Sequence, residues 1–175
     1  MDPLVAELRS GSEVAFTRTW EDYRPRVFVF LLRLSGRGDV AEELTQECFL
    51  RLARNARRLA PDTRLKSWLF VVARNLWLSH RRWAWVDGDR LIELAARALS
   101  APEPPSALEL AALSQAQRAI ERAIAAMPVS AREVFLLVAG EGMEPGEAAQ
   151  ILGIKPDAAR QRLARARRVL ETMRP

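Results

Sequence analysis

The chain has 175 residues, and its 27 Lys and Arg side chains outnumber 22 Asp and Glu, which gives a formal net charge of +5. Because 49% of the residues are hydrophobic, the composition excludes a wholly disordered chain, and one Cys with one His excludes an internal disulfide and a zinc cage. With neither a signal-peptide pattern nor an apolar run of membrane-spanning length, we expect a cytoplasmic protein that inserts into no membrane and carries no metal or cofactor.

The first half of the sequence has the apolar spacing of helices and lacks the alternating apolar and polar runs of strands. This spacing predicts helices over Asp2–Arg9, Val14–Leu34, Asp39–Arg57 and Arg64–Trp85. Asp39 is expected to be the N-cap of the third of them, because a short acceptor side chain suits that position.

The character of the sequence changes at residues 87–106. Asp and Gly open this segment and closely spaced prolines end it, a composition typical of a flexible interdomain linker. We therefore expect an all-α protein with two small helical domains, residues 1–86 and 107–175, which this linker joins.

The second domain has the same helical spacing as the first. Ser130 and Glu133 form the S-x-x-E pattern of a capping box, so a helix is expected to begin there. The helices expected in this domain cover Ala107–Met127, Ser130–Ala139, Pro145–Leu152 and Pro156–Met173.

The stretch Glu147–Arg168 predicts a helix-turn-helix. Gly153 provides the permissive backbone that the C-terminus of a helix commonly needs, and Pro156 suits the first turn of the next helix. The second helix carries several arginines, most of them outside its apolar stripe. A packed helix followed by a basic helix is the plan of a DNA-binding helix-turn-helix. The alternative, an arginine-rich solvated helix, is disfavoured because few acids on this helix balance the arginines.

A second basic segment, Arg64–Arg82, interleaves cations with aromatic rings on one face of its expected helix. Such a face suits single-stranded DNA, because cations bind phosphates and rings stack on unpaired bases. The alternative is that Phe70 and Trp77 are core residues of a wide apolar face. The residues of the mixed face are Lys66, Phe70, Arg74, Trp77 and Arg81.

Residues 39–47 are acidic, in contrast to the two basic segments. This separation of charge predicts a surface for a protein partner that is distinct from the surfaces for a polyanion. Cys48 follows directly, within a helical pattern, and is expected to be a small, half-buried core residue and not a reactive thiol.

Together, these segments resemble the extracytoplasmic-function sigma factors of bacterial RNA polymerase. DVAEELTQECFLRL (Asp39–Leu52) and RLKSWLFVVARNLWLSHRR (Arg64–Arg82) are similar to the core-binding and promoter-melting region of that family. MPVSAREVFLLVAGEGM (Met127–Met143) and EAAQILGIKPDAARQRLARARR (Glu147–Arg168) are similar to its −35-reading region. The resemblance implies a protein that is not an enzyme: it binds core polymerase, directs it to promoter DNA and helps to hold the strands apart. It also implies an anti-sigma factor as a partner.

The resemblance implies separate surfaces for polymerase and DNA in the first domain. Charge complementarity favours docking of the acidic helix on the polymerase β′ clamp helices, while an ordinary solvated face is the alternative. The residues implied in docking are Glu43, Gln46 and Glu47. The residues implied in −10 recognition and melting are Arg64, Lys66, Phe70, Arg74, Asn75, Trp77 and Arg81.

In the second domain the resemblance implies −35 recognition and contact with the polymerase β flap. Arg160 and Gln161 lie near the start of the recognition helix, where base edges come within reach, while Arg162 and Arg165 are expected to hold phosphates. Ala158 departs from the family pattern, which usually has a hydroxyl group there, so the −35 preference is not carried over unchanged. The expected −35 contacts are Lys155, Ala158, Arg160, Gln161, Arg162 and Arg165.

Two other functions fit parts of the sequence. A stand-alone helix-turn-helix regulator with an N-terminal helical sensing domain would use the C-terminal arginines, but it would leave the basic and aromatic face of Arg64–Arg82 without a purpose. A helical enzyme would need a Cys/His cluster, a glycine loop that cradles phosphate or paired buried carboxylates, and the sequence indicates none of these.

Overall fold

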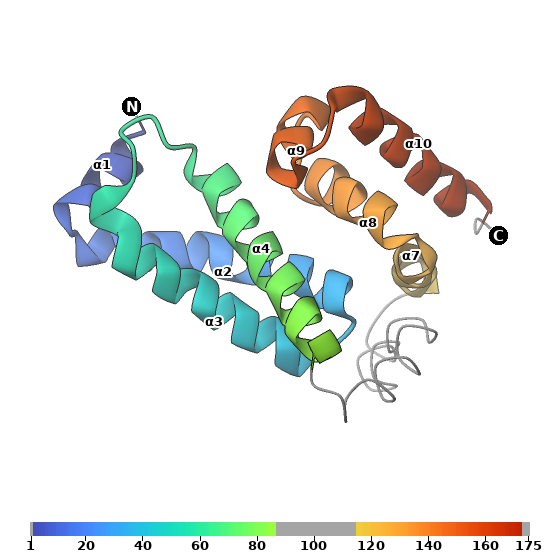
Figure 1. Cartoon of the computed structure of the whole chain (residues 1–175), viewed down its shortest axis with the longest axis horizontal. Coiled ribbons are helices and arrows are strands. Elements are labelled where there is room, and N and C mark those ends of the chain that lie inside the picture. The colour runs from blue at the N-terminus through green and yellow to red at the C-terminus, as the bar shows by residue number, and fades with distance from the viewer. Residues whose placement is uncertain (1, 87–114, 173–175) are drawn as a thin grey trace.

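The computed structural model describes residues 2–86 and 115–172. All the elements within these two ranges are helical and form two modules, which confirms the all-α class (Figure 1). The expected linker, residues 87–106, lies outside the described residues, as does the beginning of the helix expected over Ala107–Met127. None of the helices within the described ranges has both the length and the apolar character needed to cross a bilayer.

Three long helices, α2, α3 and α4, form the body of the N-terminal module, and each of them contacts the other two. Their core contains Phe49, which is 1% exposed and meets the rings of Phe16 and Trp20 edge-on, at centroid distances of 6.5 and 4.9 Å. Such edge-to-face pairs add to the stabilisation from buried apolar area. The elements of this module are α1 (Pro3–Ser10), α2 (Glu13–Ser35), α3 (Gly38–Asn55), the 3₁₀ turn η1 (Ala56–Arg58) and α4 (Leu65–Val86).

The start of α3 differs from the expectation that Asp39 is its N-cap. The cap position belongs to Arg37, and Asp39 lies within the first turn. There its carboxylate accepts hydrogen bonds from the Arg37 guanidinium and, at 2.9 Å, from the backbone N–H of Val40. These bonds, that from Arg37 above all, lower the pKa of Asp39 to about 2. A carboxylate also suits this end of a helix because the N-terminus carries the positive end of the helix dipole.

The C-terminal module contains the predicted helix-turn-helix, formed by α9 and α10. Gly153 ends α9 in the left-handed conformation, with φ 63°, which glycine adopts without strain. The apolar stripe of α10 is buried, with Ala159 at 0%, Leu163 at 5% and Ala166 at 0% exposure. The elements are α7 (Gln115–Ala126), α8 (Val129–Phe135), the π turn η2 (Leu136–Gly140), α9 (Pro145–Leu152) and α10 (Pro156–Thr172).

The capping box expected at Ser130 and Glu133 is wrong. The N-cap of α8 is Pro128, with no side-chain hydrogen bond to the helix, and Glu133 is buried. The carboxylate of Glu133 binds Arg74 of the other module instead. The local sequence favoured a capping role for Glu133, but its carboxylate instead pairs with Arg74, which is distant in the chain.

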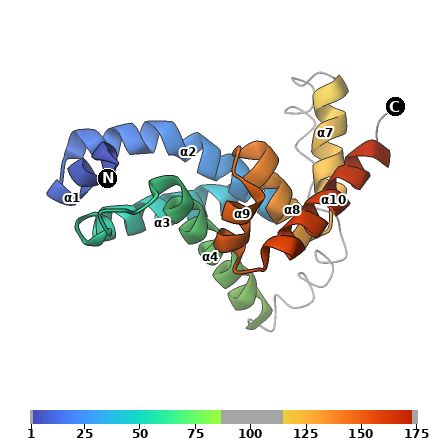
Figure 2. The same cartoon turned by 90° about the horizontal axis from the view of Figure 1, so that it is seen from above.

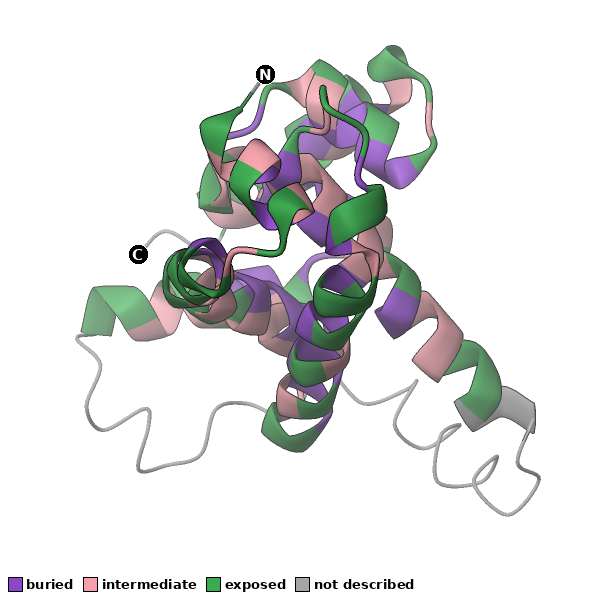
Figure 3. Cartoon of the chain, turned by 90° about the vertical axis from the view of Figure 1, so that its left-hand side faces the viewer, coloured by how far each residue is buried: buried purple, intermediate pink, exposed green. Residues whose placement is uncertain are grey.

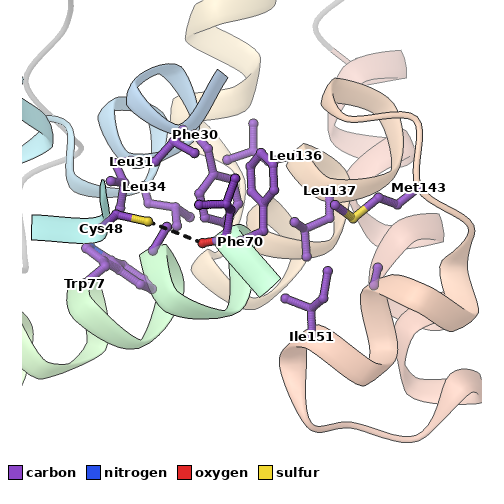
Figure 4. Packing of buried hydrophobic residues seen from close by; sticks show 14 of the residues in the cluster. Phe30, Leu31, Leu34, Cys48, Phe70, Trp77, Leu136, Leu137, Met143 and Ile151 are labelled. Carbon is purple, nitrogen blue, oxygen red and sulfur yellow. Dashed lines mark hydrogen bonds between the residues drawn. The ribbon is translucent and has the colours of Figure 1, made fainter. Parts of the chain in front are cut away.

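The two modules pack against each other, with α8 against α2 and α9 against α4 (Figure 2). Buried side chains of both modules belong to one apolar cluster, in which Phe30 and Phe70 meet edge-on at 5.2 Å and Leu136 and Ile151 come from the C-terminal module (Figure 4). Buried residues lie where the helices face one another, while the outer faces are exposed (Figure 3). The contact surface between the modules is therefore part of the core.

Candidate nucleic-acid and partner interfaces

Helix α10, the expected recognition helix, directs most of its basic side chains away from the core of its module. Ala159 is buried, whereas Arg160 and Arg165 are exposed. Arg160 forms an ion pair with Asp157 one turn earlier, which holds its guanidinium near the start of the helix. Of the expected −35 contacts, Lys155, Arg160, Gln161 and Arg165 are exposed, and Ala158 and Arg162 are half-buried.

The cations expected on α4 do not share one open face. Arg64 pairs with Glu147 of α9 at 3.2 Å, and Arg74 pairs with Glu133 of α8 at 2.8 Å. The Arg74 side chain is 17% exposed and the Glu133 side chain 6%, so this second pair is largely screened from water. Two cations expected at the −10 element are thus paired with carboxylates of the C-terminal module, although the Arg64 side chain stays 68% exposed.

Of the remaining polar residues of α4, one lies at the contact between the modules and two are exposed to solvent. Lys66 donates a hydrogen bond to the backbone carbonyl of Glu141. Asn75 is exposed, and Arg81 is exposed with its guanidinium 4.9 Å from the centroid of the Trp77 ring. The structure therefore brings Lys66 together with Arg74 at the junction and separates both from Arg81.

The aromatic rings expected on an open stacking face are in the core. Phe70 is 0% and Trp77 is 3% exposed. Phe70 packs on Phe30 of α2 with an interplanar angle of 83°. The alternative reading of these two rings, as core residues of a wide apolar face, describes this structure. Helical spacing cannot distinguish an exposed apolar stripe from one that a second module covers.

The acidic residues of α3 lie on its outer side, as the inward stripe predicted. Leu44 and Cys48 are buried at 5% and 0% exposure, while Glu43 and Gln46 are exposed. Glu47 is half-buried and accepts a hydrogen bond from Arg51 at 3.1 Å, one turn along the helix. On this face the carboxylate of Glu43 is therefore open to solvent, and that of Glu47 is held by Arg51 of the same helix.

Leu50 belongs to the same face and was missed by the sequence reasoning. It is 49% exposed, and it follows Glu43, Gln46 and Glu47 at the spacing of successive helical turns. The available signal was its position outside the inward stripe. Its exposure adds an apolar group to a face that otherwise carries carboxylates and an amide.

Cys48 is more deeply buried than expected. Its thiol lies 3.6 Å from the carbonyl oxygen of Leu69, and its exposure is 0%. Burial raises the pKa of the thiol to about 12, because a thiolate there would lose its hydration. Within the described residues, no group of three or more His, Cys, Asp or Glu could hold a metal ion.

The sequence matches two family models. Residues 19–86 match sigma-70 region 2, and residues 117–170 match sigma-70 region 4. Region 2 thus covers α3, α4 and most of α2, whereas region 4 covers α8, α9 and most of α7 and α10.

Several similar proteins are sigma factors. The extracytoplasmic-function RNA polymerase sigma factor EcfG of Rhodopseudomonas palustris is 31% identical over 85% of this chain and 79% of its own length. The RNA polymerase sigma factor CarQ of Myxococcus xanthus is 33% identical over 90% of this chain and 87% of its own. The probable RNA polymerase sigma factor RfaY of Xanthomonas campestris pv. campestris is 30% identical over 90% of this chain, which spans 40% of that longer protein.

Two solved structures share the fold. The sigma factor RpoE in complex with the anti-sigma factor NepR, from Bartonella quintana, has a TM-score of 0.72 at 23% identity and covers 90% of this chain and 95% of its own. CnrH in complex with the cytosolic domain of CnrY has a TM-score of 0.70 at 22% identity, with coverage of 97% and 94%.

Proposed function

Because this chain belongs to the extracytoplasmic-function group of sigma-70 factors, we propose that its outer α3 face binds core RNA polymerase and that α10 and α4 bind promoter DNA. As a sigma factor it directs promoter-specific initiation of transcription. The observation that carries this conclusion is the presence of both family regions, in order, over residues 19–86 and 117–170. A stand-alone regulator is not favoured, since region 2 occupies the place of its sensing domain.

For polymerase binding, the supporting feature is the combination of charge and apolar surface on α3. Glu43, Gln46 and Glu47 provide carboxylates and an amide, and Leu50 adds an exposed apolar group beside them. Opposite charges steer association, and a buried apolar anchor at the centre of an interface supplies affinity. The partner surface is the β′ clamp helices, which are proposed to be basic where they meet α3.

For the −35 element, the supporting feature is the exposure of the first half of α10. Arg160 and Gln161 lie on its open side near the N-terminal end, which is the part of a recognition helix that reaches base edges. Arg165 follows on the open side and is proposed to hold a phosphate, as is the half-buried Arg162. The C-terminal module is also proposed to contact the β flap.

For the −10 element, α4 and the residue before it are proposed to bind the opened strands through Arg64, Lys66, Arg74 and Arg81, with Asn75 as a base or backbone contact. Phe70 and Trp77 are buried, so their proposed part is to hold α4 in place. Any stacking on bases by Phe70 requires its partner Phe30 or the C-terminal module to move.

We also propose the domain bounds of the protein, one protein partner and its location in the cell. Domains over residues 1–86 and 107–175, joined by residues 87–106, are supported by the two family matches, which fall within them. An anti-sigma partner is supported by NepR, which is the anti-sigma factor in one of the similar structures. We also propose that the protein acts in the cytoplasm, where its proposed partner RNA polymerase works, and that it acts by binding, without catalysis or a cofactor.

In vitro transcription tests the proposed function most directly. The protein is added to core RNA polymerase with a fragmented genomic library, and the transcripts are sequenced. New transcripts that start downstream of one shared two-part motif are expected. Transcription no greater than that of core polymerase alone, with a protein that still binds DNA, would favour the stand-alone regulator.

A further inference from the structure

The open side of α10 carries one stripe of exposed side chains. They follow one another at spacings of one, three and four residues, which places them on one face of the helix, opposite the buried Ala159 and Leu163. A recognition helix presents such a face to the major groove. The residues of the stripe are Asp157, Arg160, Gln161, Ala164, Arg165 and Arg168.

Asp157 is the one acid in this stripe. Every phosphate of DNA carries a negative charge, so a carboxylate on a DNA-facing surface lowers the affinity for DNA of any sequence. The first turn of a helix is an ordinary place for an acid, because the N-terminus carries the positive end of the helix dipole. That role needs no side-chain partner, however, and the carboxylate of Asp157 has one.

The partner of Asp157 is Arg160, three residues further along the same face. Oδ1 of Asp157 accepts a hydrogen bond from Nη2 of Arg160. The side chains of the two residues are 81% and 62% exposed, so the pair contributes little to the stability of the fold. Its effect is on the Arg160 guanidinium, which loses part of the rotamer freedom that an exposed arginine has.

The other two arginines of the stripe are not held in this way. Neither Arg165 nor Arg168 forms an ion pair with a carboxylate of the described residues. The held arginine is therefore the one at the N-terminal end of the helix, which reaches base edges. An unheld arginine suits a phosphate, whereas a base edge requires two donors to meet two acceptors in one geometry.

The ion pair leaves Arg160 able to bind a base. A guanidinium has five N–H donors, and the contact with Asp157 uses one of the two on Nη2. Whichever of these two is used, another edge of the guanidinium still presents two parallel donors. Two parallel donors match the N7 and O6 acceptors of guanine in the major groove.

We propose that Asp157 is a positioning residue for −35 recognition: it holds the Arg160 guanidinium so that its free edge meets guanine. The proposal rests on the base-reading function proposed for Arg160. A guanidinium that is already held loses less rotamer freedom when it binds the base. The same carboxylate repels phosphate, which disfavours binding of Arg160 to the DNA backbone without a base contact.

The test measures base preference in transcription by the full chain with core RNA polymerase. Fragmented genomic DNA is the template, and the upstream motif shared by the transcripts gives the preference for guanine at each position. D157A removes the carboxylate, and D157E keeps one within reach of Arg160. E171A is the matched control, because Glu171 is the only other acid of α10 and is exposed near the opposite end of the helix.

D157A is expected to lower the preference for guanine at one position of the upstream motif about tenfold, because the bidentate contact loses its fixed geometry. E171A should leave this preference unchanged, and D157E should retain most of it. A duplex of about 30 alternating A·T pairs, which offers no guanine, should bind D157A at least as tightly as the wild type, because a negative charge is lost. Fluorescence anisotropy measures that binding.

An unchanged guanine preference in D157A would overturn the proposal and leave the sigma function intact. An equal loss of transcription from every promoter would also overturn it, because a role at the helix start alone would produce that result. Wild-type transcripts without any shared upstream motif would instead contradict the sigma function, and the positioning role with it.

A double-mutant cycle shows whether Asp157 acts through Arg160. R160A should abolish the same guanine preference, and D157A/R160A should be no less selective than R160A, since the group that Asp157 positions is absent. Losses that add in the double variant would overturn positioning. R160K keeps the charge but presents no two-donor edge, so it should lose the guanine preference even with Asp157 in place. A preference that R160K retains would refute the guanidinium contact.

Discussion

Phe49 and Leu50 are consecutive residues of α3, yet Phe49 is 1% exposed and Leu50 is 49% exposed. The first fills the core between α2 and α3, and the second stands beside the acids of the outer face. One step along a helix thus separates a residue that stabilises the module from one available to a partner.

This contrast predicts opposite results for truncation of the two side chains. Phe49→Ala removes a fully buried ring and its contacts with Phe16 and Trp20, so it is expected to lower the free energy of unfolding by about 3–5 kcal/mol. Leu50→Ala is expected to change it by no more than about 0.5 kcal/mol. Urea unfolding followed by circular dichroism measures both, and similar losses would show that Leu50 is also part of the core.

Reversal of charge on the outer face of α3 is expected to prevent polymerase binding. E43K/E47K places cations against the clamp helices and should weaken binding of core polymerase by about 100-fold or more, because like charges across an interface cost several kcal/mol. Leu50→Ala should weaken the same binding without any change in charge. Fluorescence anisotropy of labelled protein with core polymerase measures both effects.

The matched control for this prediction is E13K/D22K, which makes the same change in net charge at exposed residues of α2. It is expected to bind core polymerase nearly as the wild type does. Normal affinity in E43K/E47K, or equal losses in the two variants, would show that α3 is not the docking surface.

Loss of Arg160 is expected to impair promoter choice and not polymerase binding. Arg160→Ala removes an exposed guanidinium near the start of α10 and should lower promoter-specific transcription by about 10- to 100-fold, since a bidentate base contact contributes about 1–3 kcal/mol. Arg167→Ala, at an exposed arginine two turns later, serves as the control and should have a smaller effect. Parallel losses of transcription and core binding in R160A would refute a base-reading role.

The thiol of Cys48 is expected to resist alkylation while the protein is folded. Its pKa is raised from 9.0 to about 12 by burial, so the folded state disfavours the thiolate, and this contribution to stability is present below pH 9 and lost as the pH rises towards 12. Iodoacetamide at pH 8 should label Cys48 only in urea, as mass spectrometry can detect. Rapid labelling of the native protein would mean that α3 and α4 separate readily.

The sequence predicted those features that depend on local spacing. Pro145–Leu152 is a helix with the expected bounds, and Gly153 ends it as its backbone freedom suggested. The exposure of Glu43 followed from the inward stripe on the same helix. These outcomes need only one element and its neighbours in the chain.

Features that depend on the contact between modules could not be predicted in this way. Glu133 matched a capping box, but Arg74, 59 residues away in the chain, binds its carboxylate. Phe70 has the spacing of an exposed face and is buried because α2 and the C-terminal module cover it. Periodicity gives the direction of a side chain and does not show what will lie against it.

The π turn over Leu136–Gly140 lets the chain lose one residue at this place without a change in the register of the contact between the modules. A π turn contains one residue more than the α-helical turn it replaces. Deletion of Ala139, which is exposed, removes that extra residue, so the segment should rewind as an α-helical turn in which the Glu141 N–H still donates to the carbonyl of Leu136 and its carboxylate stays beside Arg26. A one-codon deletion in the gene would then shorten the protein at this turn and leave the charged contacts between its two halves in place.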